Sequence, residues 1–416
     1  MVERITILGG SSVYIPEFIR SLAAQKFHVK EIVLFGKEGK KLPVVANFCA
    51  RLLRRTGLPA EVVHSTNLHE AVKDAKYVIN HVRVGGMAAR VRDETLPPKM
   101  GMLGDDVLGA GGVANALRTL PVVFGFTEVL EQVNPSALFI NLTDPMGAVV
   151  EACARHTKLR VAGACDTPAL YHRKVADLLN CPPGELRLNY LGVDHLGWIQ
   201  DIIRNDASCM SRVLDLLERN GRSDSFDMTL VDLFRMIPAT KVGLYFHLDE
   251  HLKRQRAGAR FRGEVLLEAE KQILRLYEDE SLNDIPALTR QRNTVWYDTT
   301  IVPMLRALED TETREMVLCV RNDGAIRDFP DDCSVEVPAA VNKDGITPRK
   351  AGSCPRFLKG LYFMIKECDR LTVEAVRQRS YEHALQALCV NPFVPSVEAA
   401  KRFLDAVIKE EALELH

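Results

Sequence analysis

The sequence has no excess of charge of either sign. Its 416 residues include 54 Lys and Arg against 55 Asp and Glu, which gives a formal net charge of −1. This balance excludes the bulk electrostatic attraction by which many proteins bind nucleic acid or anionic lipid. We therefore expect neither a nucleic acid nor a membrane as a partner.

Targeting segments and paired cysteines are missing as well. The first residues, MVERITILGG, contain neither the apolar core nor the cleavage site of a signal peptide, and no apolar run is long enough to span a bilayer. The ten cysteines are scattered, with no CxxC pair, which is typical of a reducing compartment. These absences predict a cytoplasmic protein.

The chain is long, and predicted strands alternate regularly with predicted helices. With 47% hydrophobic residues, the chain is long enough for two joined domains. Short apolar strands alternate with helical runs up to about residue 195, and long helical stretches follow, interrupted by a β-rich excursion at 320–348. The pattern predicts a Rossmann-like α/β domain with a doubly wound parallel sheet over residues 1–195. A second, C-terminal α+β domain is expected over residues 196–416.

A Gly-rich turn follows the first predicted strand, residues 4–8. The turn is Gly9-Gly10-Ser11-Ser12, and an apolar run at helical spacing begins at Ile15. A strand, a Gly-rich turn and a helix together point backbone N–H groups and the positive helix end at a pyrophosphate. The spacing departs from GxGxxG, so a simple tight connection is the alternative.

The second predicted strand, residues 31–35, ends without the expected acidic residue. NAD-binding units usually carry a carboxylate here for the ribose hydroxyls, but this chain has Gly36-Lys37. Gly36 cannot bind a ribose, and Lys37 suits a 2′-phosphate. The sequence therefore leaves the choice between NAD and NADP open.

Two further segments offer polar side chains for ligands. The stretch after the strand at 77–82 is long and rich in Gly and Arg, and supplies Arg83 and Arg90. Arginine is the usual partner of phosphate and carboxylate groups. The strand at 137–142 ends in a polar turn, where Asn141 is placed to touch a nicotinamide ribose or a sugar hydroxyl.

Two predicted strand ends carry metal-binding or acid/base residue types. Cys165-Asp166 follows one strand and Asp194-His195 the next. Because the carboxyl ends of parallel strands meet at one edge of a sheet, we expect these residues to form one site. The alternative is a buried cysteine and a hydrogen-bonded core histidine.

The motifs, taken in order, resemble glycoside hydrolase family 4, the NAD- and metal-dependent glycosidases. The resemblance runs nearly end to end and includes ITILGGSSVYIPE, RVGGMAARVRDETLP, GAGGVANALRTLPV, NLTDPMG, ACDTP, LGVDHLGW and VRNDGAIRDFPDDCSVEVP. It implies a fold like that of lactate and malate dehydrogenases, with NAD and a divalent ion, typically manganese, as cofactors. Relatives are commonly homodimers or homotetramers.

The resemblance also implies an unusual reaction. NAD takes a hydride from C3 of the sugar, a base removes the acidified C2 proton, the glycosidic oxygen leaves, water adds, and the hydride returns. The metal ligands correspond to Cys165 and His195. Asp166 matches the general acid of the phospho-α-glucosidase type, while Asp194 stands where the family usually has Asn and adds a negative charge near the metal.

Two segments depart from the family pattern. Lys241 stands at the position of the tyrosine that acts as C2 base, and it can replace that base only if its pKa is lowered; Tyr245 is the fallback. Arg292 is followed by Asn293-Thr294 where the family tends to have two glycines.

Many relatives act on sugars phosphorylated at C6. The residues that we expect to hold such a group are Arg83, Arg90, Arg260 and Arg292. The pyrophosphate of the cofactor or a uronic acid would be held by the same residue type.

Three hypotheses follow. The first is an NAD- and manganese-dependent 6-phospho-glucosidase that acts on a small sugar. The second is a dehydrogenase of lactate or malate type, against which the ACDTP loop argues. The third is a catalytically degenerate protein that binds a sugar or a nucleotide.

Overall fold

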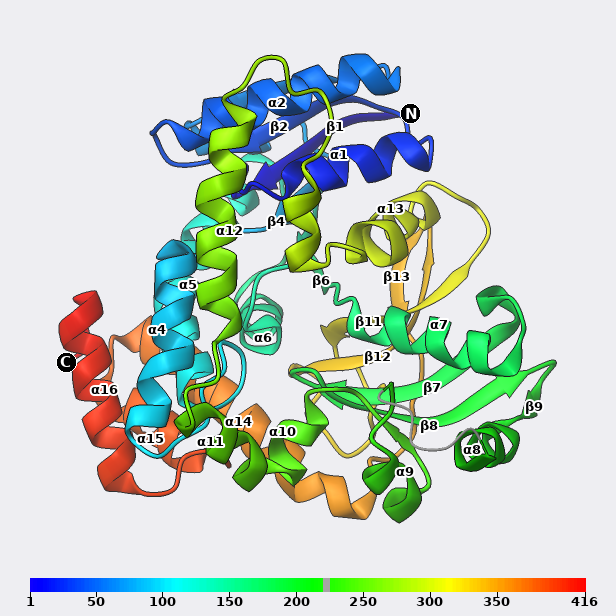
Figure 1. The fold of residues 1–416 in the computed structure, drawn as a ribbon, viewed down its shortest axis with the longest axis vertical. Coiled ribbons are helices and arrows are strands. Elements are labelled where there is room, and N and C mark those ends of the chain that lie inside the picture. The colour runs from blue at the N-terminus through cyan, green and yellow to red at the C-terminus, as the bar shows by residue number, and fades with distance from the viewer. Residues whose placement is uncertain (220–224) are drawn as a thin grey trace.

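The computed structural model describes residues 1–219 and 225–416. Its sheet has a parallel part, drawn in the upper half of Figure 1, with the strand order β6-β5-β4-β1-β2-β3. This order confirms the Rossmann-like prediction. The parallel strands are β1 (Val2–Leu8), β2 (Val29–Phe35), β3 (Glu61–Ser65), β4 (Tyr77–Asn80), β5 (Leu138–Asn141) and β6 (Arg160–Gly163).

The rest of the sheet is antiparallel. The order continues from β6 through β11, β12, β7 and β8 to β10, with β13 on β12 and β9 on β8. The strands are β7 (Leu186–Val193), β8 (Leu196–Arg204), β9 (Ala207–Ser208), β10 (Ile237–Pro238), β11 (Arg314–Arg321), β12 (Ser334–Asn342) and β13 (Gly345–Pro348). The predicted β-rich excursion at 320–348 is thus confirmed.

The expectation that β7 continues the parallel sheet is wrong. β7 forms a hairpin with β8 and pairs with β12, both antiparallel. Two consecutive strands joined by a two-residue turn can pair only in this way. His195 therefore lies in a hairpin turn and not at the carboxyl edge of a parallel strand.

Helices cover the sheet and extend beyond it. The first set is α1 (Ile15–Ala24), α2 (Lys41–Thr56), α3 (Leu68–Val72), α4 (Gly86–Lys99), α5 (Gly109–Val133), α6 (Met146–His156), α7 (Thr167–Leu179) and α8 (Met210–Arg219). The second set is α9 (Met228–Phe234), α10 (Val242–Phe246), α11 (Leu248–Arg256), α12 (Arg262–Tyr277), α13 (Val302–Ala307), α14 (Arg356–Gln378), α15 (Tyr381–Val390) and α16 (Val397–Glu411). Short turns are η1 (Pro183–Glu185), η2 (Ala287–Arg292) and the π-helical η3 (Tyr297–Ile301).

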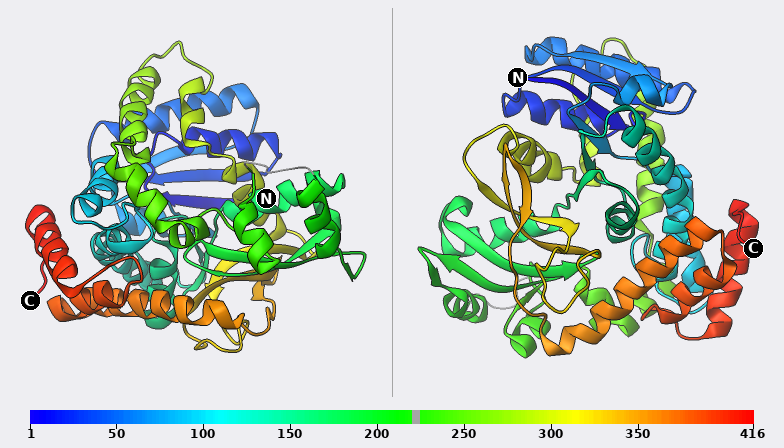
Figure 2. Two further views of the ribbon diagram at one scale, coloured as in Figure 1. Left: turned by 60° about the horizontal axis from the view of Figure 1, so that its bottom comes forward. Right: turned by 180° about the vertical axis from the view of Figure 1, so that it is seen from behind.

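Helix α5 corrects one expectation from the sequence. It is long and apolar enough, by length and composition, to cross a membrane, and 56% of its apolar window is buried inside the protein. α14, α15 and α16 pack against it, as the view from behind shows (Figure 2). A core helix of a globular protein passes the same test of length and composition.

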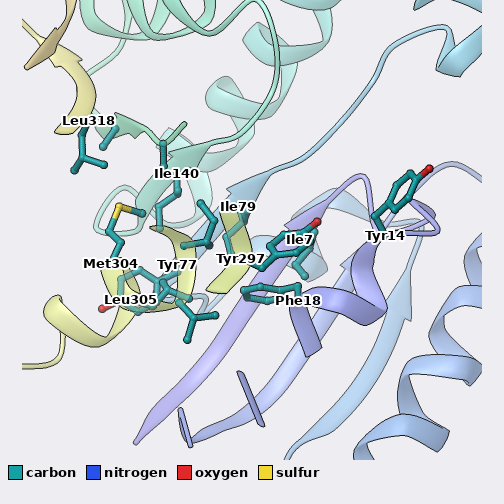
Figure 3. Packing of buried hydrophobic residues seen from close by; sticks show 14 of the residues in the cluster. Ile7, Tyr14, Phe18, Tyr77, Ile79, Ile140, Tyr297, Met304, Leu305 and Leu318 are labelled. Carbon is teal, nitrogen blue, oxygen red and sulfur yellow. The ribbon is translucent and has the colours of Figure 1, made fainter. Parts of the chain in front are cut away.

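Segments from the two halves of the chain share one hydrophobic core. Phe18 of α1 lies beside Tyr297 of η3, with ring centroids 5.6 Å apart, and Met304 and Leu305 belong to the same cluster as Tyr77 (Figure 3). Helix α12 packs on α2 and α4 (Figure 1). The division at residue 195 stays a prediction, and the β7–β8 hairpin lies across it.

Candidate active site

The β7–β8 turn presents His195 in a strained conformation. Asp194 and His195 have φ of +46° and +65° between the paired residues Val193 and Leu196. Two positive φ values suit the type I′ turn of a tight hairpin but are costly for residues with a side chain. The surrounding structure must therefore hold this turn in place.

Two buried carboxylates hold the turn. An oxygen of Glu336 on β12 accepts the His195 N–H at 2.8 Å. The Asp194 carboxylate accepts the N–H of Gly147, in the first turn of α6, at 2.7 Å, where the helix dipole favours a negative charge. The expected extra charge of Asp194 is thus bound to a helix end.

Cys165 and His195 meet at this point. Cys165 Sγ lies 3.0 Å from His195 Nδ1, and Asp144 Oδ1 lies 3.3 Å from Nε2 on the other side of the ring. Burial raises the pKa of the Cys165 thiol, although His195 opposes the shift. Burial lowers the pKa of His195, but the charges of Cys165 and Asp144 outweigh it and raise the pKa well above its usual value.

The donors fit a divalent ion. With metal–sulfur and metal–nitrogen bonds of about 2.3 and 2.0 Å, two ligands of one ion lie about 3 Å apart at a right angle and about 3.5 Å apart at a tetrahedral angle. The Cys165–His195 distance of 3.0 Å lies at the lower end of this range. Within residues 1–219 and 225–416, no group of three or more His, Cys, Asp or Glu side chains could hold a metal ion. Other positions on the ion would belong to water and substrate oxygens, as a catalytic site requires.

A cavity of about 510 Å³ lies next to His195. Asp166 and Thr167, at the start of α7, line it together with His195. Its remaining charged lining residues are Arg90, Glu94, Asp105, Asp106, Asp144, Lys241, His251, Arg254, Arg260, Arg262 and Arg292. Such a mixture suits a polar, anionic ligand such as a sugar phosphate.

The arginines predicted to bind a phosphate differ in whether they already form ion pairs within the protein. Arg83 pairs with Asp106 at 2.9 Å, and Arg90 pairs with Asp106 at 3.2 Å and Glu94 at 2.8 Å. Arg260 is exposed at the rim and pairs with Glu268. The three arginines therefore keep a carboxylate partner in the absence of a ligand.

Arg292 has no carboxylate partner among the ion pairs of the described residues. Its guanidinium lies 4.9 Å from the ring centroid of Tyr14 and 5.2 Å from that of Trp296, and its Nε is buried without a hydrogen-bond partner. Burial, together with the charge of Arg83, lowers the pKa of Arg292 to about 10. A fixed, desolvated guanidinium of this kind is suited to an anionic ligand.

A second cavity, of about 310 Å³, adjoins the first. Gly9, Ser11, Ser12, Lys37 and Arg83 line it, and Arg292 and Asp144 line both cavities. This position at the end of β1 and the start of α1 fits a dinucleotide.

Gly10 has a different role from its neighbours. The N–H groups of Gly9 and Gly10 both donate to the carbonyl of Phe35, at 3.0 and 2.7 Å. A Cβ on Gly10 would lie 2.5 Å from that of Leu34. Gly10 does not line the cavity, because it allows the turn to pack closely on β2.

Models of this family match most of the chain. "Family 4 glycosyl hydrolase" matches residues 4–181, and "Family 4 glycosyl hydrolase C-terminal domain" matches residues 190–394. The chain belongs to glycosyl hydrolase family 4.

Family 4 relatives cover essentially the whole chain. A probable 6-phospho-beta-glucosidase of Bacillus subtilis is 29% identical, over 98% of this chain and 96% of its own. The 6-phospho-beta glucosidase from Thermotoga maritima, solved with manganese, NAD+ and glucose-6-phosphate, has a TM-score of 0.91 at 27% identity and full coverage of both chains. A 6-phospho-alpha-glucosidase from gut microorganisms, solved with NAD and glucose-6-phosphate, has a TM-score of 0.89 at 27% identity and full coverage.

The predicted likeness to malate dehydrogenase holds at the level of the fold. The enzyme from Cryptosporidium parvum has a TM-score of 0.54 at 14% identity, over 91% of this chain and 100% of its own. The Family 4 membership argues against the dehydrogenase hypothesis.

Lys241, at the position of the Family 4 tyrosine, does line the substrate cavity. Its Nζ contacts both oxygens of Asp105, at 2.7 and 2.6 Å. Burial lowers the pKa of Lys241, but the charges of Asp105 and Asp106 more than offset it, so the pKa is raised. The condition for Lys241 to act as a base, a lowered pKa, is therefore not met by these contacts alone.

Tyr245 does not line the cavity; its neighbour Leu244 does. The ring of Tyr245 packs edge-on against Phe246 and Phe393, at 5.2 and 5.9 Å. Asn293 has φ of +57°, a conformation that glycine adopts freely and that asparagine tolerates better than most residues. Asn293 can therefore replace a Family 4 glycine without a change of backbone.

Asn141 lies away from both cavities. It is fully buried, its Oδ1 accepts from Asn80 at 2.8 Å, and its Nδ2 donates to the Thr143 carbonyl at 2.9 Å. Its amide shapes the turn that presents Asp144, so the structure does not support the direct contact with cofactor and substrate that the sequence suggested.

Sequence reasoning missed Glu336 and gave no role to Asp105, Asp106 or Asp144. Glu336 is a single acidic residue inside an otherwise apolar buried strand. An acidic residue at such a position is a signal that could have been used, because a buried carboxylate needs a partner. Asp144 lies in the same NLTDPMG motif that the sequence singled out.

Proposed function

We propose that the chain hydrolyses the O-glycosidic bond of 6-phosphorylated glucosides. Its cofactors are NAD and a divalent ion, which we propose to be manganese. The observation that carries the proposal is the Cys165–His195 pair, 3.0 Å apart, beside the cavity of about 510 Å³ that His195 lines and near the cavity of about 310 Å³ that shares Asp144 with it. Asp144 and Arg292 line both cavities, and the ion pair between Arg83 in one cavity and Asp106 in the other joins them. The sugar-phosphate complexes of relatives support the same substrate class.

The chain's own residues divide the work. When bound, NAD supplies a hydride acceptor and donor, and the metal polarises sugar oxygens. Cys165 and His195 hold the ion, while Gly9, Ser11 and Ser12 hold the dinucleotide beside it.

Asp166 donates the proton to the leaving glycosidic oxygen. It lines the cavity and contacts Cys165, with Sγ and Oδ1 3.6 Å apart. A carboxyl group at this place acts as an acid when its proton is retained until the bond breaks.

Lys241 removes the C2 proton. Its amine must be neutral to do so, and Asp105, 2.6 Å from Nζ, opposes the loss of that proton because it stabilises the ammonium form. The neutral amine then accepts the proton from C2, and the positive charge that Lys241 gains balances the negative charge left on the sugar.

Arg90, Arg260 and Arg292 bind the phosphate, with Arg83 nearer to the cofactor. Arg292 contributes most, because its charge has no carboxylate partner in the described part of the chain and its Nε is buried without a hydrogen-bond partner.

We also propose a cytoplasmic homodimer or homotetramer. Exposed apolar side chains on α14, among them Phe357, Phe363 and Met364, support self-association because such groups gain from burial. Light scattering after size exclusion would measure the subunit number, and a monomer at micromolar concentration would contradict it.

The test uses four 4-nitrophenyl glucosides, α and β, each with and without a 6-phosphate. Each is assayed with NAD, manganese and a reducing agent, and then with NAD or manganese omitted. We expect turnover of a phosphorylated substrate that requires both cofactors. Turnover without NAD would contradict the oxidation route, and binding of glucose-6-phosphate without any turnover would favour the degenerate binding protein.

A further inference from the structure

The proposed nucleotide cavity has no carboxylate at the end of β2, where NAD-binding folds usually carry one. At the end of β2, the cavity is lined by Phe35, Gly36 and Lys37, and by Lys41 at the start of α2. In NAD-binding folds this place carries an acidic residue that accepts hydrogen bonds from the adenosine ribose. Without it, a fold of this kind has lost its usual means of choosing NAD over NADP.

Among the residues that the structure describes, two acidic ones line this cavity, Asp144 and Glu270. Asp144 lies at the metal end, 3.3 Å from the His195 ring. Glu270 comes from α12, in the other half of the chain, and its Oε1 lies 2.5 Å from Nζ of Lys41. Glu270 is therefore at the end of the cavity where β2 stops and α2 starts.

The surroundings hold Glu270 in position. Its side chain is 18% exposed, whereas Lys41 is 54% exposed. Helix α12 packs on α2, so the carboxylate comes from a packed helix and lines the cavity together with the end of β2.

We propose that Glu270 is the specificity-determining residue that makes the protein select NAD over NADP. Its carboxylate accepts hydrogen bonds from the ribose hydroxyls, the role that Gly36 cannot fill. A 2′-phosphate at the same place would bring its negative charge against Glu270, which also neutralises Lys41. The inference rests on the proposed function only in requiring a dinucleotide in this cavity.

The charges at this end of the cavity favour NAD over NADP. Lys37 and Lys41 alone would attract a 2′-phosphate. Lys37 is exposed, so water and salt screen its charge, and Lys41 is paired with Glu270. The least exposed charge at this end of the cavity is thus a negative one.

The experiment measures the dissociation constants of NAD and NADP by isothermal titration calorimetry, without metal or substrate. For Glu270→Gln we expect weaker NAD binding and tighter NADP binding, with the ratio of the two constants changed by about tenfold or more, since a hydrogen bond to a charged group is worth roughly 1.5–3 kcal/mol. Glu268→Gln is the matched control, an exposed acidic residue on the same helix, and should leave both constants unchanged.

Lys41→Met provides a second variant with the opposite prediction. It leaves the Glu270 charge unpaired, so NADP binding should weaken further relative to NAD. An unchanged ratio in both variants would overturn the role of Glu270 while NAD binding by the unaltered protein upheld the proposed function. Failure of the unaltered protein to bind either nucleotide would overturn both.

Discussion

Lys241 and Asp105 form a two-point ion pair across the wall of the substrate cavity, with Nζ 2.7 and 2.6 Å from the two carboxylate oxygens. The residues are far apart in the sequence, one before α5 and one at the start of α10. The pair keeps an ammonium group beside the sugar site until a proton is moved. The pH at which Lys241 can act as a base therefore depends on its partner.

Replacing Asp105 by Asn should shift the pH dependence of the reaction. Asp105 raises the pKa of Lys241, so its removal lowers that pKa and increases the fraction of neutral amine at a given pH. We expect the rise of kcat with pH to occur at lower pH in Asp105→Asn. The measurement is the exchange of the C2 proton with deuterated solvent over a range of pH.

Two results would contradict a role of Lys241 as base. One is an unchanged profile in Asp105→Asn. The other is unaltered C2 exchange in Lys241→Ala, with Lys253→Ala, an exposed residue of α11, as the control.

Substitution of either metal ligand should abolish activity and leave the fold intact. Cys165→Ser and His195→Ala each remove one of the two donors, and we expect a fall in manganese affinity of more than about 100-fold, larger than the effect of losing an outer-shell partner. Manganese electron paramagnetic resonance measures free ion, and circular dichroism checks the fold. Cys181→Ser, a free cysteine away from the site, should bind manganese normally; equal affinity in all variants would remove the metal role.

Glu336→Gln should weaken metal binding without removing a ligand. Glu336 accepts the His195 N–H at 2.8 Å and the Tyr190 hydroxyl at 3.3 Å, and an amide has only one oxygen with which to accept. The strained turn then loses a hydrogen bond that holds it. We expect manganese affinity to fall by roughly 10- to 100-fold, the usual range for outer-shell partners. Tyr190→Phe removes the second hydrogen bond alone and should cost less; the reverse order would show that Glu336 does not act through His195.

The buried Asp93 on α4 should make the stability of the protein depend on pH. Arg118 on α5 binds Asp93 at 2.6 Å and Glu411 of α16 at 2.6 Å. Burial raises the pKa of Asp93 to about 7 from 3.8, although Arg118 opposes the shift. The folded protein therefore binds a proton between about pH 4 and 7 that the unfolded chain has lost, so the free energy of unfolding falls as the pH rises through this window.

Asp93→Asn isolates this effect because it cannot titrate. The stability of the unaltered protein relative to Asp93→Asn should decrease from pH 5 to pH 8, as measured by thermal unfolding. A constant difference across that range would show that Asp93 has an ordinary pKa in the folded state.

The sequence was sufficient for the elements whose signal is local. The strand predicted at 4–8, the glycine turn after it and the apolar run from Ile15 correspond to β1 and α1, because apolar spacing and turn residues determine them. The edge strand β3 was missed because EVVHS is short and half polar. A buried parallel strand and one arm of a hairpin have the same apolar pattern, so the direction of β7 could not be read from its residues.

The site was predictable in its members but not in its contacts. Cys165 and His195 carried a recognisable motif, and the structure brings them together, although through a hairpin turn and not through a shared sheet edge. The partners Asp105, Glu270 and Glu336 act over long sequence separations, and no local pattern states which cation or N–H group a buried acid will meet. Asn141 is an example of a polar residue at a strand end that stabilises the following turn and does not line a cavity.

Helix α12 carries Glu270 in the nucleotide cavity and, one turn earlier, Leu266 in the sugar cavity. A stiff helix cannot shift at one of these positions without shifting at the other. A ligand that shifts α12 in one cavity therefore alters the other cavity as well, and by thermodynamic reciprocity such a coupling changes both affinities by the same factor.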